Sequence, residues 1–243
     1  MLIALPLAGC GSTVSKPHFA IDGKTPAIAQ AALAGKRTSK EYETTAVKSS
    51  GLKDRLVGDY VVFKFTGAFR KGTIQLTETV VAHEGSIIVV DFAMLENIPG
   101  PKGVIVKEQT LRAKIDTTVG SRGEVFGVQK LEKGGVTQPA TVADWEAMMA
   151  KTVLSADANE ETYGTEEVDM KVLGKTVTAD RTAYKVLIGK KTATMTITAS
   201  DAFVWGDLAG EIVDDDGNVL YKAELVDSGH TIQPFFATDD DGI

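Results

Sequence analysis

The sequence predicts a mainly β protein: an antiparallel meander sheet, curved or forming a half-barrel, with one covering helix at about residues 141–153 and a short N-terminal helix. Three observations predict this class. Apolar residues keep the two-residue spacing of strands over 57–116, with turn residues between the runs. Residues 141–153 instead repeat their apolar side chains at helical spacing. Strand spacing then returns from residue 165.

The meander contains four expected strands, at 57–67, 72–83, 86–96 and 105–117. The third is apolar on both faces from Ile87 to Leu95, which is typical of a strand in the middle of a sheet that is covered on each side. A fifth strand is expected at 123–132, before the turn Lys133-Gly134-Gly135.

The clearest helix signal begins at Thr141, a suitable N-cap with Asp144 three residues on. The apolar residues that follow share one helical face: Val142, Trp145, Met148, Met149 and Val153. This face is expected to pack against the sheet as plain core. Because methionine adapts to varied shapes, the alternative is a pocket for a hydrophobic ligand. Its lining residues would be Phe63, Phe65, Phe92, Trp145, Met148 and Met149.

The second half of the chain predicts further strands, at 167–172, 176–181, 182–188, 192–199, 203–213 and 219–226. A polar loop that contains Glu160-Glu161 and Glu166-Glu167 is expected before them. Threonines alternate with apolar residues over 192–199, so one face of that strand should be wet and one buried. The tail after Gly229 is expected to be loose.

The whole chain has 243 residues, enough for one β-rich domain at 51–243, with halves at about 51–135 and 136–230. Residues 11–50 are rich in Ser, Thr, Lys and Ala and predict a tether. Within it, Thr25 and Pro26 can begin a short helix that ends near Gly35. The net charge of −7 argues against nucleic acid and anionic lipid headgroups as general partners, because both would repel the chain.

The single cysteine, Cys10, ends a short apolar run. Leu7-Ala8-Gly9-Cys10 resembles the lipobox of bacterial lipoprotein signal peptides. The resemblance implies that Leu7, Ala8 and Gly9 are the cleavage recognition residues and that Cys10 is lipidated. Only Met1 precedes the apolar run, whereas a signal peptide begins with a basic segment. Residues 1–10 are therefore either a truncated signal segment whose start lies upstream, or an N-terminus with a chance cysteine.

Beyond the lipobox, the chain resembles bacterial envelope lipoproteins of poorly defined function. Residues 172–229 are similar to domains of that group, through a Gly-Lys-Thr strand, a Thr-rich strand and the closing Glu-Leu-Val-Asp-Ser-Gly at 224–229. The expected architecture also resembles the open half-barrels of LolA-like lipoprotein carriers. That resemblance implies binding of acyl chains on the concave face, and it assigns no residue.

Catalytic, metal and cofactor motifs are not evident. Asp214, Asp216 and Asn218 have the spacing of half a calcium loop, but Val219 stands where that loop needs its glycine, so a hairpin turn is expected. Gly174-Lys175-Thr176 lacks the loop and helix of a phosphate site. The three histidines are too scattered to share a metal.

The sequence therefore favours a membrane-anchored, non-enzymatic binding or scaffold protein of the cell envelope, with a lipid or an envelope protein as its partner. The alternative is an envelope hydrolase whose site is built from residues distant in sequence.

Overall fold

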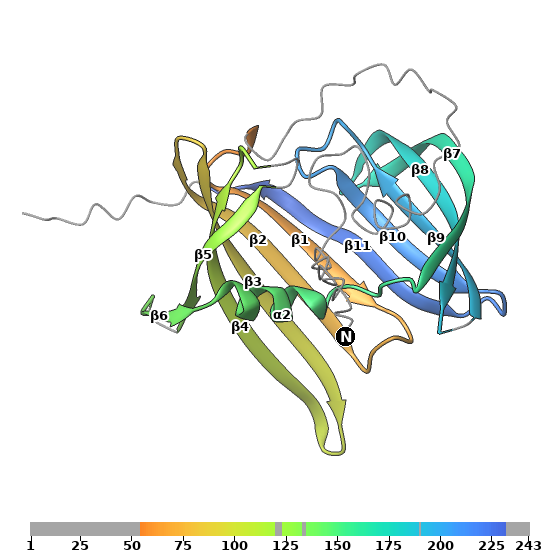
Figure 1. Cartoon of the computed structure of the whole chain (residues 1–243), viewed down its shortest axis with the longest axis horizontal. Coiled ribbons are helices and arrows are strands. Elements are labelled where there is room, and N and C mark those ends of the chain that lie inside the picture. The colour runs from red at the N-terminus through yellow and green to blue at the C-terminus, as the bar shows by residue number, and fades with distance from the viewer. Residues whose placement is uncertain (1–53, 120–122, 133–134, 190, 232–243) are drawn as a thin grey trace, which may run out of the picture.

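The computed structural model describes residues 54–119, 123–132, 135–189 and 191–231. Its strands form one antiparallel sheet of eleven strands, which is twisted and not closed into a barrel (Figure 1). Open sheets of more than about ten strands curl because strand twist accumulates. The predicted mainly β class with an antiparallel sheet is confirmed. The predicted N-terminal helix lies outside the described residues.

The first half of the described chain contains β1 (Asp59–Thr66), β2 (Thr73–Glu84), β3 (Ile87–Gly100), β4 (Gly103–Asp116), β5 (Glu124–Leu131), β6 (Thr137–Ala140) and α2 (Val142–Ala150). The second half contains β7 (Ala158–Val172), β8 (Lys175–Ile188), β9 (Lys191–Ala199), β10 (Asp207–Asp214) and β11 (Val219–His230). No helix in these described segments is long and apolar enough to cross a membrane.

The strands lie in the order β6-β5-β4-β3-β2-β1-β11-β10-β9-β8-β7. The sheet therefore consists of two meanders that are joined where β1 pairs with β11, at the two ends of the described chain. Because β6 and β7 form opposite edges, the connection between them has to cross the sheet. The helix α2 begins that crossing (Figure 1).

The core lies on the face of the sheet where α2 sits, which we call the inner face. In β2, for example, Ile74, Leu76 and Val80 are buried, while the intervening side chains are more exposed. This alternation is the strand pattern of the sequence. The predicted wet and buried faces of residues 192–199 are also found, since Ala193, Met195 and Ile197 are buried.

The prediction that β3 is covered on both faces is wrong in part. β3 lies between β2 and β4, and its inner face is buried. On the outer face, Val89 is buried, whereas Ile87 and Leu95 are only half-buried. There Arg112 of β4 forms a two-point ion pair with Asp91, with nitrogen–oxygen distances of 2.6 and 2.8 Å. Most of the outer face of β3 is therefore partly accessible to water, and it does not form a second core.

Several element boundaries were predicted wrongly, and two corrections concern edge strands. The edge strand β6 was not predicted, because its four residues show no apolar alternation and include Pro139, which edge strands tolerate. The loop predicted around Glu161 and Glu166 is part of the other edge strand, β7. An edge strand exposed on both faces has no alternation to detect, and its charges oppose pairing with another chain.

Three more boundaries differ from the prediction. Residues 176–188 form one continuous strand, β8, which pairs with β9 from Asp180 to Ile188. The helix ends at Ala150 rather than Val153, and the Thr152 hydroxyl donates a hydrogen bond to the Met149 carbonyl there. Residues 203–206 form a turn before β10 begins.

Candidate functional site

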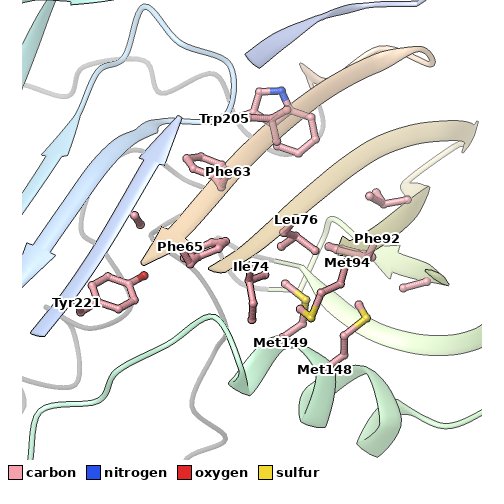
Figure 2. Close-up of a cluster of buried hydrophobic side chains, with 14 of the residues drawn as sticks. Phe63, Phe65, Ile74, Leu76, Phe92, Met94, Met148, Met149, Trp205 and Tyr221 are labelled. Atoms are coloured by element: carbon pink, nitrogen blue, oxygen red, sulfur yellow. The ribbon is translucent and has the colours of Figure 1, made fainter. Parts of the chain in front are cut away.

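The inner face is a continuous apolar surface that spans both meanders. Adjacent strands place its side chains in direct register, with Phe63 opposite Leu76 and Phe65 opposite Ile74. Figure 2 shows that its large side chains come from β1, β2, β3, β11 and α2, with Trp205 from the turn before β10. The labelled members are Phe63, Phe65, Ile74, Leu76, Phe92, Met94, Met148, Met149, Trp205 and Tyr221, all of them buried.

Aromatic rings form the middle of the inner face. The ring centroids of Phe63 and Phe65 lie 6.3 Å apart, and Phe65 lies 6.4 Å from Tyr221. Phe69, in the β1–β2 loop, extends this row, with its centroid 5.3 Å from that of Tyr221. These separations are within the range in which tilted aromatic pairs attract. The row crosses the joint between β1 and β11, so it holds the two meanders together.

The helix α2 covers one part of the inner face. Thr141 and Asp144 form the predicted capping box, in which each side chain accepts a hydrogen bond from the other residue's backbone N–H. Met148 and Met149 are buried against the sheet, whereas Trp145 is only partly buried. The Trp145 ring packs edge-on against Phe92, with the centroids 5.7 Å apart. Its indole Nε1 is enclosed, yet it has no hydrogen-bond acceptor.

The chain leaving α2 is held to the sheet by two sets of polar contacts. Lys151 Nζ lies 2.6 Å from Glu96 Oε1, and Arg70 Nη2 lies 3.4 Å from Glu96 Oε2. Arg70 Nη1 also donates to the Lys151 carbonyl at 2.7 Å. Burial lowers the pKa of Arg70, and the Glu96 carboxylate opposes that shift. Further on, the Tyr221 hydroxyl donates to the Thr152 carbonyl at 3.0 Å, and burial raises the pKa of Tyr221.

A second charged cluster lies where the chain enters the sheet. Arg55 is 1% exposed, and its guanidinium carbon lies 3.6 Å from the centre of the Trp205 ring. Burial lowers the pKa of Arg55 to about 10, while the charges of Glu78, Asp207 and Asp59 raise it. Buried carboxylates around a buried cation are a structural arrangement that removal of either partner would disrupt. We therefore assign this cluster to stability rather than chemistry.

The structure brings the predicted pocket residues together. Phe63, Phe65, Phe92, Met148 and Met149 all belong to the buried inner-face cluster, and Trp145 packs against it. Whether they contact a ligand stays a prediction. The predicted lipidation and cleavage residues, Leu7, Ala8, Gly9 and Cys10, lie outside the described residues.

Sequence reasoning missed the charged members of the inner face, Glu78, Glu96 and Arg55. A signal for two of them was present. Glu78 shares its strand parity with Leu76 and Val80, so strand alternation alone could have placed this charge on the inner face. Glu96 likewise continues the parity of Met94 in β3. Arg55 gave no such signal, because it precedes the first strand.

The described residues contain no group of three His, Cys, Asp or Glu side chains placed to hold a metal. The predicted hairpin turn at 214–218 is found, with β10 ending at Asp214 and β11 beginning at Val219. Asp214 Oδ1 accepts hydrogen bonds from the backbone N–H groups of Asp216 and Asn218. The Asn218 side-chain amide also donates to the Asp214 carboxylate. The bond from this amide and those from the backbone N–H groups of Asn218 and Asp216 lower the pKa of Asp214 and close the turn.

Comparisons with known proteins find solved structures that have low similarity to this chain, among them the following three. No family profile matches the sequence, and no curated protein matches it. A hypothetical protein from Chlamydia trachomatis is 11% identical, with a TM-score of 0.40 over 73% of this chain and 89% of its own. A presumed exported protein with a YmcC-like fold from Bacteroides fragilis is 11% identical, with a TM-score of 0.32 over 72% and 96% of the two chains. A presumed lipoprotein from Parabacteroides distasonis is 12% identical, with a TM-score of 0.32 over 74% and 98%.

Proposed function

We propose that this protein is a lipid-anchored, non-enzymatic binding protein of the bacterial envelope, and that its inner face holds a hydrophobic ligand with an acyl chain. The ligand proposal rests on the difference in extent between the inner face and the helix α2. The apolar face crosses an open sheet of eleven strands. The nine residues of α2 span only about 14 Å at 1.5 Å per residue, so this helix covers a part of that face.

The side chains under α2 suit an acyl chain that carries an oxygen acceptor. Met94, Met148 and Met149 are adjacent in Figure 2, and methionines adapt to a flexible chain. The enclosed indole Nε1 of Trp145 lacks an acceptor. An unsatisfied buried donor costs about 1–3 kcal/mol, which a carbonyl or carboxylate oxygen of a ligand would recover. The ligand would enter by displacing α2.

The anchor part of the proposal rests on the sequence. Leu7-Ala8-Gly9-Cys10 matches the lipobox pattern, and residues 11–58 separate it from β1. Such a tether would hold the sheet near a membrane while leaving it free to meet a ligand or an envelope partner.

Organic extraction of the purified protein followed by mass spectrometry tests the ligand directly. A lipid should be recovered in stoichiometric amount, and a dansyl-labelled fatty acid should bind to the delipidated protein. Replacement W205F leaves Trp145 as the single tryptophan of the chain, so oleate binding should change its emission. Folded protein that yields no lipid and binds no probe would contradict the proposal.

A matched pair of variants tests the role of the Trp145 donor. W145F keeps an aromatic ring against Phe92 but removes the N–H group, so its affinity for oleate should fall about five- to tenfold. Its affinity for an oxygen-free hydrocarbon probe should stay unchanged. The control Y163F alters an exposed ring on the edge strand β7 and should affect neither. Equal loss of both probes in W145F would argue that the ring packs the core without contacting a headgroup.

A further inference from the structure

The end of the hairpin formed by β3 and β4 projects from the sheet beyond the paired parts of β2 and β5 (Figure 1). Pairing of β2 with β3 ends at Asn97, and pairing of β5 with β4 ends at Thr110. The hairpin itself continues to Gly100 and Gly103. At about 3.4 Å per residue, its end extends about 10 Å beyond the last pair with β2 and about 24 Å beyond the last pair with β5. We call residues 97–107 the hairpin tip.

The hairpin tip exposes apolar side chains on both of its faces. Val104, Ile105 and Val106 are 64%, 51% and 55% exposed. Val104 pairs with Pro99, and Ile105 pairs with Ile98, so the two aliphatic pairs lie on opposite faces of the ribbon. An isolated two-stranded ribbon is marginally stable in water. A flat protein surface could cover one face only, whereas a medium that surrounds the tip would cover both.

The hairpin tip also differs in charge from the rest of the protein. Its sequence contains Lys102 and Lys107 and no acidic residue, although the whole chain has a net charge of −7. Electrostatic repulsion falls off over about 8 Å at physiological salt. Lys102, in the turn of the hairpin, lies about 10 Å beyond the last pair of β3 with β2, whereas Lys107 lies opposite Glu96 at the base of the tip. An anionic surface can therefore attract the turn end of the tip while the charge of the acidic body is screened.

We propose that the hairpin tip docks into the headgroup layer of an anionic phospholipid bilayer. Val104, Ile105 and Val106 enter the boundary between headgroups and acyl chains, and the two lysines contact lipid phosphates. The depth is limited, because the outer edges of the ribbon carry unpaired backbone groups that hydrocarbon does not satisfy. Pro99 and Pro101 lie at the tip and have no N–H group, which reduces the number of such groups.

This docking is independent of the hydrophobic ligand proposed above, since the tip lies outside the inner-face cluster. It adds a second contact with the membrane to the proposed lipid anchor. A single anchor on a long tether leaves the sheet free to rotate, whereas two contacts give it a fixed orientation over the bilayer.

Vesicle binding by the full chain tests the proposal. The chain carries Cys10→Ala in every sample, so that no acyl anchor contributes. At physiological salt it should bind vesicles with 30% phosphatidylglycerol and bind pure phosphatidylcholine vesicles much more weakly. The variant K102Q/K107Q should lose about 25-fold in affinity, at about fivefold for each lysine near an anionic surface. The variant V104S/I105S/V106S should lose about tenfold or more. Both variants should keep the parent melting temperature, because the tip lies outside the core.

A fluorescent label locates the contact in the same protein. Removal of Cys10 leaves the chain without cysteine, so V104C provides a single site for an environment-sensitive dye. Its emission should shift to the blue with phosphatidylglycerol vesicles. The emission of the same dye at Y163C should not shift, because Tyr163, 55% exposed, lies on the distant edge strand β7.

Two results would overturn the docking. One is that the parent chain and both tip variants bind anionic vesicles equally, or not at all. The other is a dimer in sedimentation equilibrium that V104S/I105S/V106S abolishes while no vesicle binding is seen, which would make the tip a protein–protein interface.

Discussion

The Lys151 ammonium group lies 2.6 Å from the Glu96 carboxylate, so the C-cap residue of α2 forms an ion pair with an inward-facing position of β3. This relationship fixes the connection that crosses the sheet. The Glu96 side chain is 11% exposed and that of Lys151 is 43% exposed. The carboxylate is therefore the more sensitive partner, because it has lost more of its hydration.

Replacement of Glu96 by Gln should lower the free energy of unfolding by about 1–3 kcal/mol, because the nearby Arg70 guanidinium loses its counter-charge. Urea melts measure this change. The control E108Q, on the exposed part of β4, should change stability by less than about 0.5 kcal/mol. Equal effects at the two positions would mean that the contact does not hold α2 in place.

The stability lost when an α2 side chain is replaced by alanine should follow the burial of that side chain rather than its size. Met149→Ala should cost about 2–5 kcal/mol, as for a fully buried methionine. Trp145→Ala should cost less than the 3–5 kcal/mol of a buried tryptophan, because Trp145 is only partly buried. Denaturant melts of the two variants provide the comparison. A larger loss from Trp145→Ala would show that this ring is a main support of α2.

At alkaline pH, the buried Tyr221 phenol should lower the stability of the folded protein. Its folded-state pKa is raised by burial above the ordinary value of 10.0. The phenol therefore stays protonated in the folded protein while the unfolded chain ionises, so stability present below pH 10 is lost as the pH rises. Tyr221→Phe should lower stability near pH 7 by about 1 kcal/mol, since the Thr152 carbonyl loses its donor. Above pH 10, the difference in the free energy of unfolding between Tyr221→Phe and the parent should narrow. Curves of stability against pH for the two proteins measure this difference.

Lipidation of Cys10 is the prediction on which membrane anchoring depends. The full gene, with any codons upstream of Met1, should give membrane-bound protein whose mass shows multiple acylation, because a single chain anchors a protein only marginally. Intact-mass measurement of the membrane fraction tests this. The Cys10→Ser form should appear in the soluble fraction. An unmodified thiol in soluble parent protein would contradict the prediction.

The sequence by itself determined the fold class and most of the strands, because these depend on local patterns. Alternation in β2 and β9 and turn residues such as Asp216-Gly217 require no knowledge of distant residues. The capping box at Thr141 and Asp144 is likewise local, and the structure contains it. The grouping of Phe63, Phe65 and Phe92 on one buried face could be expected from strand parity alone.

Only the tertiary structure decided which strands form the edges, and with them the position of α2. Pairing of β1 with β11 brings together residues that are more than 150 positions apart, and backbone pairing carries no local sequence signal. That pairing places β6 and β7 at opposite edges, so the α2 segment crosses the inner face. The lengths of β2 and β5 in turn leave the end of the β3–β4 hairpin unpaired on its outer edges. Whether an apolar residue such as Ile105 is buried depends on how far the adjacent strands extend, which is a property of the assembled sheet.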